Sequence, residues 1–161
     1  MAGILETLER AGTAASSSAI GGWLYHAVCR RIDTVLIPAT KGRLAMGPPG
    51  QTLLLRTTGA KSGKRRTASL AFMWRGEDMI VIASKGGAPH HPGWYHNVQA
   101  DPRVEVESRC GVEDRIARVA EGEERDKLFE QMAATYSNFA AYQDRATNRT
   151  IPVVVLEPVR G

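Results

Sequence analysis

The chain has 161 residues, of which 43% are hydrophobic and 24% are charged, and its formal net charge is +4. This length and balance fit one globular domain with a buried core, and they exclude a disordered protein. The two cysteines, Cys29 and Cys110, match no metal-ligand spacing, so we expect free thiols in a reducing cytosol. The first ten residues lack the pattern of a signal peptide, and we therefore expect a cytoplasmic protein.

The first third of the chain is expected to be helical. Residues 3–37 predict one or two helices, and residues 37–50 predict a connecting loop. Residues 11–29 carry no charged side chain, but eight of them are Gly, Ser, Thr or His, which is too polar for a membrane span. This part of the chain carries two short apolar stripes: Ile4, Leu5 and Leu8, and Trp23, Leu24, Ala27 and Val28. Each stripe either packs on the domain or rests on a membrane surface.

The rest of the chain predicts strands, turns and a long helix. Strands are expected over residues 52–58, 67–74, 78–84, 103–108, 115–120 and 151–156, with a hairpin turn at 75–78. Helices are expected over residues 94–100 and 123–145. Few strand–helix–strand alternations occur, so we predict a mainly β, α+β protein: an antiparallel barrel with helices packed outside it. Residues 1–47 would form a helical segment and linker, and residues 48–161 the barrel, within one domain.

Basic residues are concentrated in one part of the chain. No acidic residue occurs between Asp33 and Glu77, whereas eight basic ones do: Lys41, Arg43, Arg56, Lys61, Lys64, Arg65, Arg66 and Arg75. Such a stretch should attract an anionic partner. The run has few interleaved aromatics and no nucleic-acid-binding motif, so we favour a phosphorylated small molecule over nucleic acid.

Two glycine-bearing loops are candidate anion sites. Residues 59–65 (GAKSGKR) resemble a P-loop superficially, but the glycines are one residue too close and Arg65 replaces the required Ser or Thr. The segment is therefore either a plain basic hairpin turn or a loop whose backbone N–H groups and cations bind phosphate. Residues 84–89 (SKGGAP) follow a buried strand, where two glycines let the backbone approach a ligand closely.

The sequence offers no clear metal site or nucleophile. His90, His91 and His96 match no standard ligand pattern. No G-x-S-x-G motif and no evident carboxylate pair occur. Loops suited to anions without a reactive side chain favour a reaction whose chemistry a cofactor carries.

Two long motifs resemble one known family. TTGAKSGKRRTASL at residues 57–70, followed by ASKGGAPHHPGWYHNVQADPRVEV at 83–106, is similar to the deazaflavin (F420)-dependent nitroreductases of actinobacteria, which include F420H2-dependent quinone reductases. The resemblance implies a six-stranded split β-barrel of the FMN-binding type that uses reduced coenzyme F420 (F420H2) and no metal. It also implies a monomer. The coenzyme carries a phosphodiester and a polyglutamate tail, in agreement with the basic loop.

The resemblance also implies residue roles. The coenzyme phosphate and tail would contact Ala60, Lys61, Ser62, Arg66, Thr67 and Ala68. The deazaflavin ring would lie along Ile82, Ala83, Ser84 and Lys85, with further contacts from Trp94, Tyr95, Asn97 and Phe139. Tyr136, Phe139 and Tyr142 would line the substrate pocket; ordinary core packing is the alternative for side chains at this helical spacing. Ser84 would position the ring, and Tyr136 or solvent would supply a proton.

The implied reaction is hydride transfer to a quinone or a nitro compound. Phe139 replaces a tyrosine of the best-known nitroreductase relative and has no hydroxyl to orient a nitro group, so we favour a menaquinone-like quinone. A quinone substrate would give the N-terminal segment a role on the inner face of the cell membrane. Three alternatives remain open: an F420-dependent reductase of an enone, lipid or terpenoid, an FMN enzyme, and a non-catalytic F420-binding protein.

Overall fold

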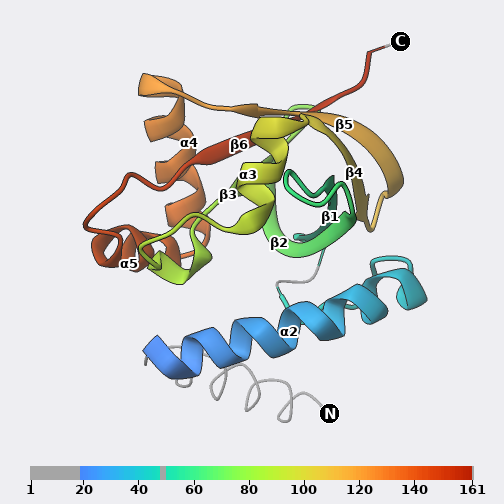
Figure 1. Ribbon diagram of the computed structural model, residues 1–161, viewed down its shortest axis with the longest axis horizontal. Helices are drawn as coiled ribbons and strands as arrows, with labels where there is room; N and C mark the ends of the chain where they lie inside the picture. The colour runs from blue at the N-terminus through green and yellow to red at the C-terminus, as the bar shows by residue number, and fades with distance from the viewer. Residues whose placement is uncertain (1–18, 48–49, 161) are drawn as a thin grey trace.

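Antiparallel strand pairing closes the sheet into a barrel. The computed structural model describes residues 19–47 and 50–160, and its strands pair in the order β1-β2-β3-β6-β5-β4, with every pairing antiparallel (Figure 1). The strands are β1 (Thr52–Thr58), β2 (Arg65–Arg75), β3 (Asp78–Ile82), β4 (Arg103–Ser108), β5 (Gly111–Val119) and β6 (Val153–Pro158). Pairing of Leu55 with Val106 joins β1 to β4 and closes the barrel. The predicted six-stranded barrel is confirmed.

The barrel interior is one of two hydrophobic cores. Inward-facing Leu53, Leu55, Val104 and Val106 are at most 4% exposed, as the alternation in their strands predicts. The second core lies outside the barrel, between β3 and β6 on one side and the C-terminal helices on the other. Strand β6 is apolar at four successive positions because one of its faces lines each core.

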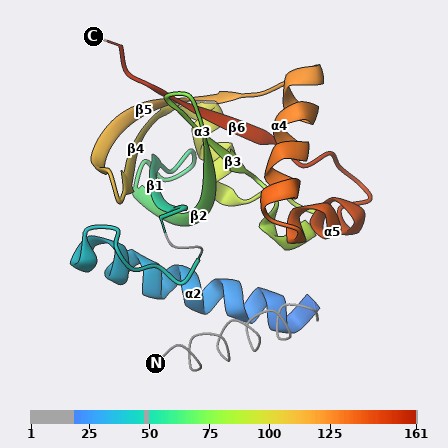
Figure 2. The same ribbon diagram turned by 180° about the vertical axis from the view of Figure 1, so that it is seen from behind.

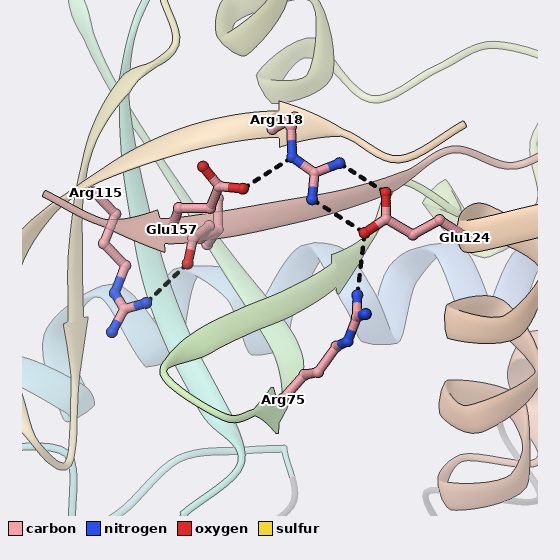
Figure 3. Close-up of polar contacts among 6 residues, drawn as sticks. Arg75, Arg115, Arg118, Glu124 and Glu157 are labelled. Carbon is pink, nitrogen blue, oxygen red and sulfur yellow. Dashed lines mark hydrogen bonds and ion pairs between the residues drawn. The ribbon is translucent and has the colours of Figure 1, made fainter. Parts of the chain in front are cut away.

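The helices surround the barrel. They are α2 (Ala19–Thr40), α3 (Gly93–Ala100), α4 (Gly122–Thr135) and α5 (Asn138–Arg145), with a 3-10 turn η1 (Lys85–Gly87) after β3. An ion-pair network fixes α4 to the strands (Figure 3). Glu124 pairs with Arg118 at 2.7 Å and with Arg75 at 3.0 Å, and Arg118 also pairs with Glu157 at 2.9 Å.

Helix α2 lies along the outside of the barrel in both views (Figures 1 and 2). Its inner face carries Asp33 and Ile37, both buried. The two carboxylate oxygens of Asp33 accept a 2.6 Å hydrogen bond from Ser69 Oγ and a 2.7 Å bond from Met46 N. Residues 1–18, with the stripe Ile4, Leu5 and Leu8, lie outside the described residues, as do the side chains of Trp23, Leu24 and Ala27. In the part of the chain that the structure describes, no helix is long and apolar enough to span a membrane.

Element boundaries differ from the sequence prediction in several places. The single helix over 123–145 is wrong, because Tyr136 is extended (φ −129°, ψ 93°) and separates α4 from α5. Ser137 and Asn138 follow it, and these residue types favour helix ends over helix interiors. Helix α2 continues through Pro38 to Thr40, β2 begins at Arg65, β5 at Gly111 and β6 at Val153, so those predicted limits were also shifted.

Candidate functional site

The basic hairpin loop between β1 and β2 is a closed turn. Gly59 N donates to the Lys64 carbonyl at 2.8 Å, and Gly63 N donates to the Gly59 carbonyl at 2.7 Å. Gly63 has a φ of +63°, which favours glycine. Strand β2 follows directly, so the exclusion of a P-loop is confirmed. Lys61 lies at the exposed tip of this turn.

Tertiary structure partly neutralises the basic run. Glu105 and Glu107 of strand β4 form ion pairs with Arg56, and Glu105 also forms an ion pair with Arg65 at 2.5 Å. Hydrogen bonding by Arg65 is the main reason that the pKa of Glu105 falls below its ordinary value. Exposed cations without an ion pair among the described residues then remain on and beside the hairpin loop: Lys61, Lys64 and Arg66. The positive charge is concentrated where the coenzyme tail was predicted.

Asn97 joins α3 to the hairpin loop. Its Oδ1 accepts a 3.0 Å hydrogen bond from Ala60 N, and its Nδ2 donates to Thr57 Oγ1 at 2.9 Å. The side chain is 9% exposed. Asn97 therefore fixes the position of Ala60, one of the predicted coenzyme contacts.

The segment after β3 forms a left-handed turn. Ser84 is in the αR region, and Lys85, Gly86 and Gly87 all have positive φ. An αR–αL pair such as Ser84–Lys85 directs successive N–H groups into a concave anion-binding nest. A positive φ at a lysine costs on the order of 1–2 kcal/mol, so neighbouring contacts must hold the turn. The backbone of this turn has the conformation of an anion-binding nest, and the predicted anion site there stays a prediction.

Those contacts come from α5 and the loop that follows it. Arg149 Nη2 donates to the Ser84 carbonyl at 2.8 Å, and Arg149 Nε donates to the Ala88 carbonyl at 3.0 Å. A Cβ on Gly87 would lie 2.6 Å from the Tyr142 carbonyl oxygen, so only glycine allows α5 this close. Arg149 was missed by the sequence reasoning because it lies in a loop without any motif.

Buried aromatic residues of α3 complete this side of the site. Trp94 and Tyr95 are 7% and 8% exposed, and they share the barrel core with Ala68 and Ala83. His91 stacks against Tyr95 with its ring centroid 4.8 Å away. Among the described residues, no cluster of His, Cys, Asp or Glu could hold a metal ion.

The three predicted substrate residues form one row. Phe139 packs edge-on against Tyr136 and Tyr142, with ring centroids 5.9 and 5.8 Å apart. The Tyr136 hydroxyl contacts Gln51 Oε1 and lies 3.1 Å from the Phe72 carbonyl oxygen, and burial raises its pKa to about 12. These three rings lie in the second hydrophobic core, outside the barrel, which we call the outer core.

The end of β3 lies between the two sets of residues. Ile82 packs in the outer core with Phe139 and Tyr142, whereas the next residue, Ala83, lies in the barrel core with Trp94. Successive residues of an extended chain point to opposite faces, so Ile82 faces the core of the aromatic row while Ala83 faces the barrel core. A predicted ring contact, Ile82, therefore shares a core with Phe139 and Tyr142.

A groove of about 550 Å³ opens beside the hairpin loop. Its lining includes Gly63, residues from β1, β4 and β5, and side chains of both charges: Arg56, Arg65, Arg103, Arg115, Glu105 and Asp114. Glu105 pairs with Arg56 and Arg65, and Glu113 pairs with Arg115, so the groove adds little to the positive charge of the loop.

The closed, six-stranded antiparallel barrel places the chain in the class of split β-barrels. Residues 29–158 match the family described as F420H(2)-dependent quinone reductase. The F420H(2)-dependent quinone reductase Rv1261c of Mycobacterium tuberculosis is 40% identical over 134 residues, which cover 78% of this chain and 87% of the relative. The chain belongs to the F420H2-dependent quinone reductase family, and it is an oxidoreductase that uses coenzyme F420.

Two solved structures are similar to this chain in sequence and in fold. The F420-H2 dependent reductase FDR-A is 44% identical with a TM-score of 0.61, covering 66% of this chain and 94% of that one. A structure described as a domain-swapped dimer is 39% identical with a TM-score of 0.64, covering 79% and 96%. The site fits the coenzyme, because Lys61, Lys64 and Arg66 offer exposed charges for a phosphate and an acidic tail.

Proposed function

We propose that the protein reduces a menaquinone-like quinone with F420H2. The observation that carries this is that Ile82, one of the predicted ring contacts, packs in the same core as Phe139 and Tyr142. When bound, F420H2 supplies the electron pair as a hydride, and with one added proton the quinone becomes a quinol. The flat apolar faces of Phe139 and its two tyrosine neighbours suit a quinone ring.

The residues that bind the coenzyme act from three segments. The phosphate and acidic tail lie at the hairpin loop, on Ala60, Lys61, Ser62, Arg66, Thr67 and Ala68, and along the adjacent groove. The ring lies on Ile82, Ala83, Ser84 and Lys85, with Ser84 as the residue that positions it. Trp94, Tyr95 and Asn97 flank it, and the buried rings of α3 exclude water from the hydride.

The aromatic row sets the choice of acceptor. Tyr136, Phe139 and Tyr142 line the substrate side, and Tyr136 or solvent supplies the proton. Phe139 contributes no hydroxyl to orient a nitro group, which favours quinones over bulky nitro compounds. A nitro-type acceptor is the second candidate, since the same hydride donor serves both.

We also propose that a monomer contacts the inner membrane surface through α2. Val28, Ile32 and Val35 lie at helical spacing on its outer face and are 48%, 40% and 70% exposed. Arg31 is exposed on the same helix, as suits an anionic lipid surface. A quinone dissolved in the bilayer would then be close to its enzyme. Flotation of the protein with anionic and with neutral vesicles tests this proposal. Absence of the protein from both vesicle fractions would contradict it.

Two measurements test the reductase proposal. Titration with F420 and with FMN, followed by tryptophan fluorescence, establishes the coenzyme; binding of FMN without a response to F420 would refute the assignment. Oxidation of F420H2 on adding menadione, followed by the returning absorbance of the oxidised coenzyme, separates an enzyme from a binding protein. A nitroimidazole measured in parallel ranks the two acceptor classes, and we expect menadione to be faster.

A further inference from the structure

The guanidinium of Arg149 has four hydrogen-bonding partners in the segment that follows β3. It donates to the carbonyls of Ser84 at 2.8 Å, Ala88 at 3.0 Å and Ala83 at 3.4 Å. Its Nη1 also lies 3.0 Å from His91 Nδ1. One side chain therefore fixes both ends of the left-handed turn 85–87.

Fixing these carbonyls also fixes the N–H groups of the turn. A peptide unit is planar and trans, so its C=O and N–H point in opposite directions. With the Ser84 carbonyl held on Arg149, the Lys85 N–H must point away from the guanidinium. The Ala83 carbonyl orients the Ser84 N–H in the same way. These are the N–H groups of the anion-binding nest.

We infer that Arg149 is a positioning residue for the coenzyme: by binding the carbonyls of Ser84 and Ala88, it holds the turn in the conformation that presents its N–H groups to the deazaflavin ring. The inference rests on the proposed assignment of residues 82–85 to that ring. Arg149 does not touch the reacting atoms, and it acts only through the backbone that it orients.

The same residue connects this turn to the substrate side. Gln143 on α5 donates from Nε2 to the Arg149 carbonyl at 3.0 Å, and its Oε1 accepts from Ile151 N at 2.9 Å. Helix α5 also carries Phe139 and Tyr142. The backbone of Arg149 is thus fixed to the aromatic helix while its side chain is fixed to the coenzyme turn.

Lysine cannot replace arginine here. The planar guanidinium presents five donors in a fixed fork, whereas an ammonium is a single point that cannot reach the Ser84 and Ala88 carbonyls together. Arg149→Lys therefore keeps the charge and removes the geometry. Asn148→Ala is the matched control, because Asn148 lies next to Arg149 and, among the described residues, its side chain donates to the Pro89 carbonyl alone, at 3.1 Å.

Hydrogen exchange of the coenzyme-free protein is the first readout. In Arg149→Lys we expect the amides of residues 84–88 to exchange about tenfold faster or more, as follows from losing one or two charge-assisted hydrogen bonds. Exchange in the barrel strands and in Asn148→Ala should match the wild type. Unchanged exchange at 84–88 in Arg149→Lys would overturn the inference.

Coenzyme binding is the second readout. Arg149→Lys should raise the Kd for F420 about tenfold, which corresponds to roughly 1.4 kcal/mol. The KM for menadione should stay within about twofold of the wild-type value, because the acceptor residues are unchanged. In Arg149→Ala, added guanidinium ion should restore F420 affinity; if that variant does not fold, Arg149→Lys alone decides.

The two proposals fail in different ways. Wild-type protein that does not bind F420 would refute the proposed function, whatever the exchange data show. Faster exchange at residues 84–88 combined with unchanged F420 affinity in Arg149→Lys would overturn the positioning role and leave the proposed function standing.

Discussion

The side-chain oxygen of Asn97 accepts a 3.0 Å hydrogen bond from the backbone N–H of Ala60 and so joins α3 to the hairpin loop. The amide nitrogen of Asn97 is also committed, to Thr57 Oγ1. A single buried side chain thus sets the distance between two segments that are predicted to bind the coenzyme.

Removing this amide should loosen the loop. Asn97→Ala should destabilise the fold by about 1–3 kcal/mol, since it leaves buried polar partners unsatisfied. It should also weaken F420 binding, because Ala60 and Lys61 lose their fixed position. Thermal unfolding and fluorescence titration measure the two effects. Wild-type affinity in a folded Asn97→Ala protein would contradict the role of Asn97 in placing the loop.

The charge of the hairpin loop should matter more for binding than for folding. Lys61→Glu combined with Arg66→Glu replaces two exposed cations with carboxylates at the predicted tail site. We expect F420 affinity to fall by at least about tenfold, with a steep salt dependence, while the unfolding free energy changes by under about 1 kcal/mol.

A second double variant controls for net charge. Lys41→Glu with Arg43→Glu makes the same charge change beyond the end of α2, away from the hairpin loop. Its affinity for F420 should stay close to that of the wild type. Equal losses in both double variants would mean that only the overall field matters.

Tyr136 is the proposed protein source of the proton. Its hydroxyl donates to the Phe72 carbonyl oxygen at 3.1 Å, and burial raises its pKa to about 12, so the phenol stays protonated but is a weaker acid than an ordinary tyrosine. Tyr136→Phe should lower kcat by about tenfold or more while the Kd for F420 stays constant, as for loss of a general acid. An unchanged kcat would assign the proton to solvent.

The ion pairs around Glu124 should make stability depend on acid (Figure 3). Hydrogen bonds from Arg118 and then from Arg75 lower the pKa of Glu124 from 4.5 to about 2. A carboxylate with a lowered pKa stabilises the fold above pH 4.5, and this contribution is lost as the pH falls toward 2. The side chain is 33% exposed, so solvent screening limits the contribution to about 1 kcal/mol.

Glu124→Gln should therefore unfold about 2–4 °C below the wild type at pH 7. The gap should close as the pH is lowered through 4.5 toward 2. Glu123→Gln, whose side chain is 92% exposed, should show almost no gap at any pH. A gap for Glu124→Gln that stays constant from pH 7 to 2 would show that the carboxylate charge is not its cause.

Local patterns were enough to predict most of the barrel. Residues 103–108 alternate because Val104 and Val106 face the interior while Glu105 faces out, and strand sterics make this alternation regular. The hairpin at 75–78 followed from Gly76, which has a φ of +62° in the turn. These features depend only on neighbours in sequence.

Other features depend on residues far apart in the chain. The apolar stripe of residues 128–139 continues at helical spacing through Tyr136, and it outweighed the local signal of Ser137 and Asn138, so the break between α4 and α5 was not predicted. The Tyr136 hydroxyl contacts Gln51 and Phe72, which are far from it in the sequence. The neutralising carboxylates Glu105 and Glu107 likewise reach Arg56 only in the folded barrel.

The coenzyme residues were predicted from the resemblance to a family, whereas the residues that hold them in place were not predicted. Arg149 and Gln143 belong to no sequence motif, and only the structure shows which backbone carbonyls their side chains bind. Supporting contacts of this kind use backbone carbonyls, which every residue has, so sequence carries little trace of them.

Backbone hydrogen exchange with and without F420 tests the central claim, that the coenzyme lies across three segments at one end of the barrel. We expect saturating F420 to protect residues 59–68, 82–88 and 93–97, while α4 and the outer face of α2 stay unchanged. Protection confined to other segments, or the same protection pattern with FMN at lower concentration, would contradict the assignment of this site to F420.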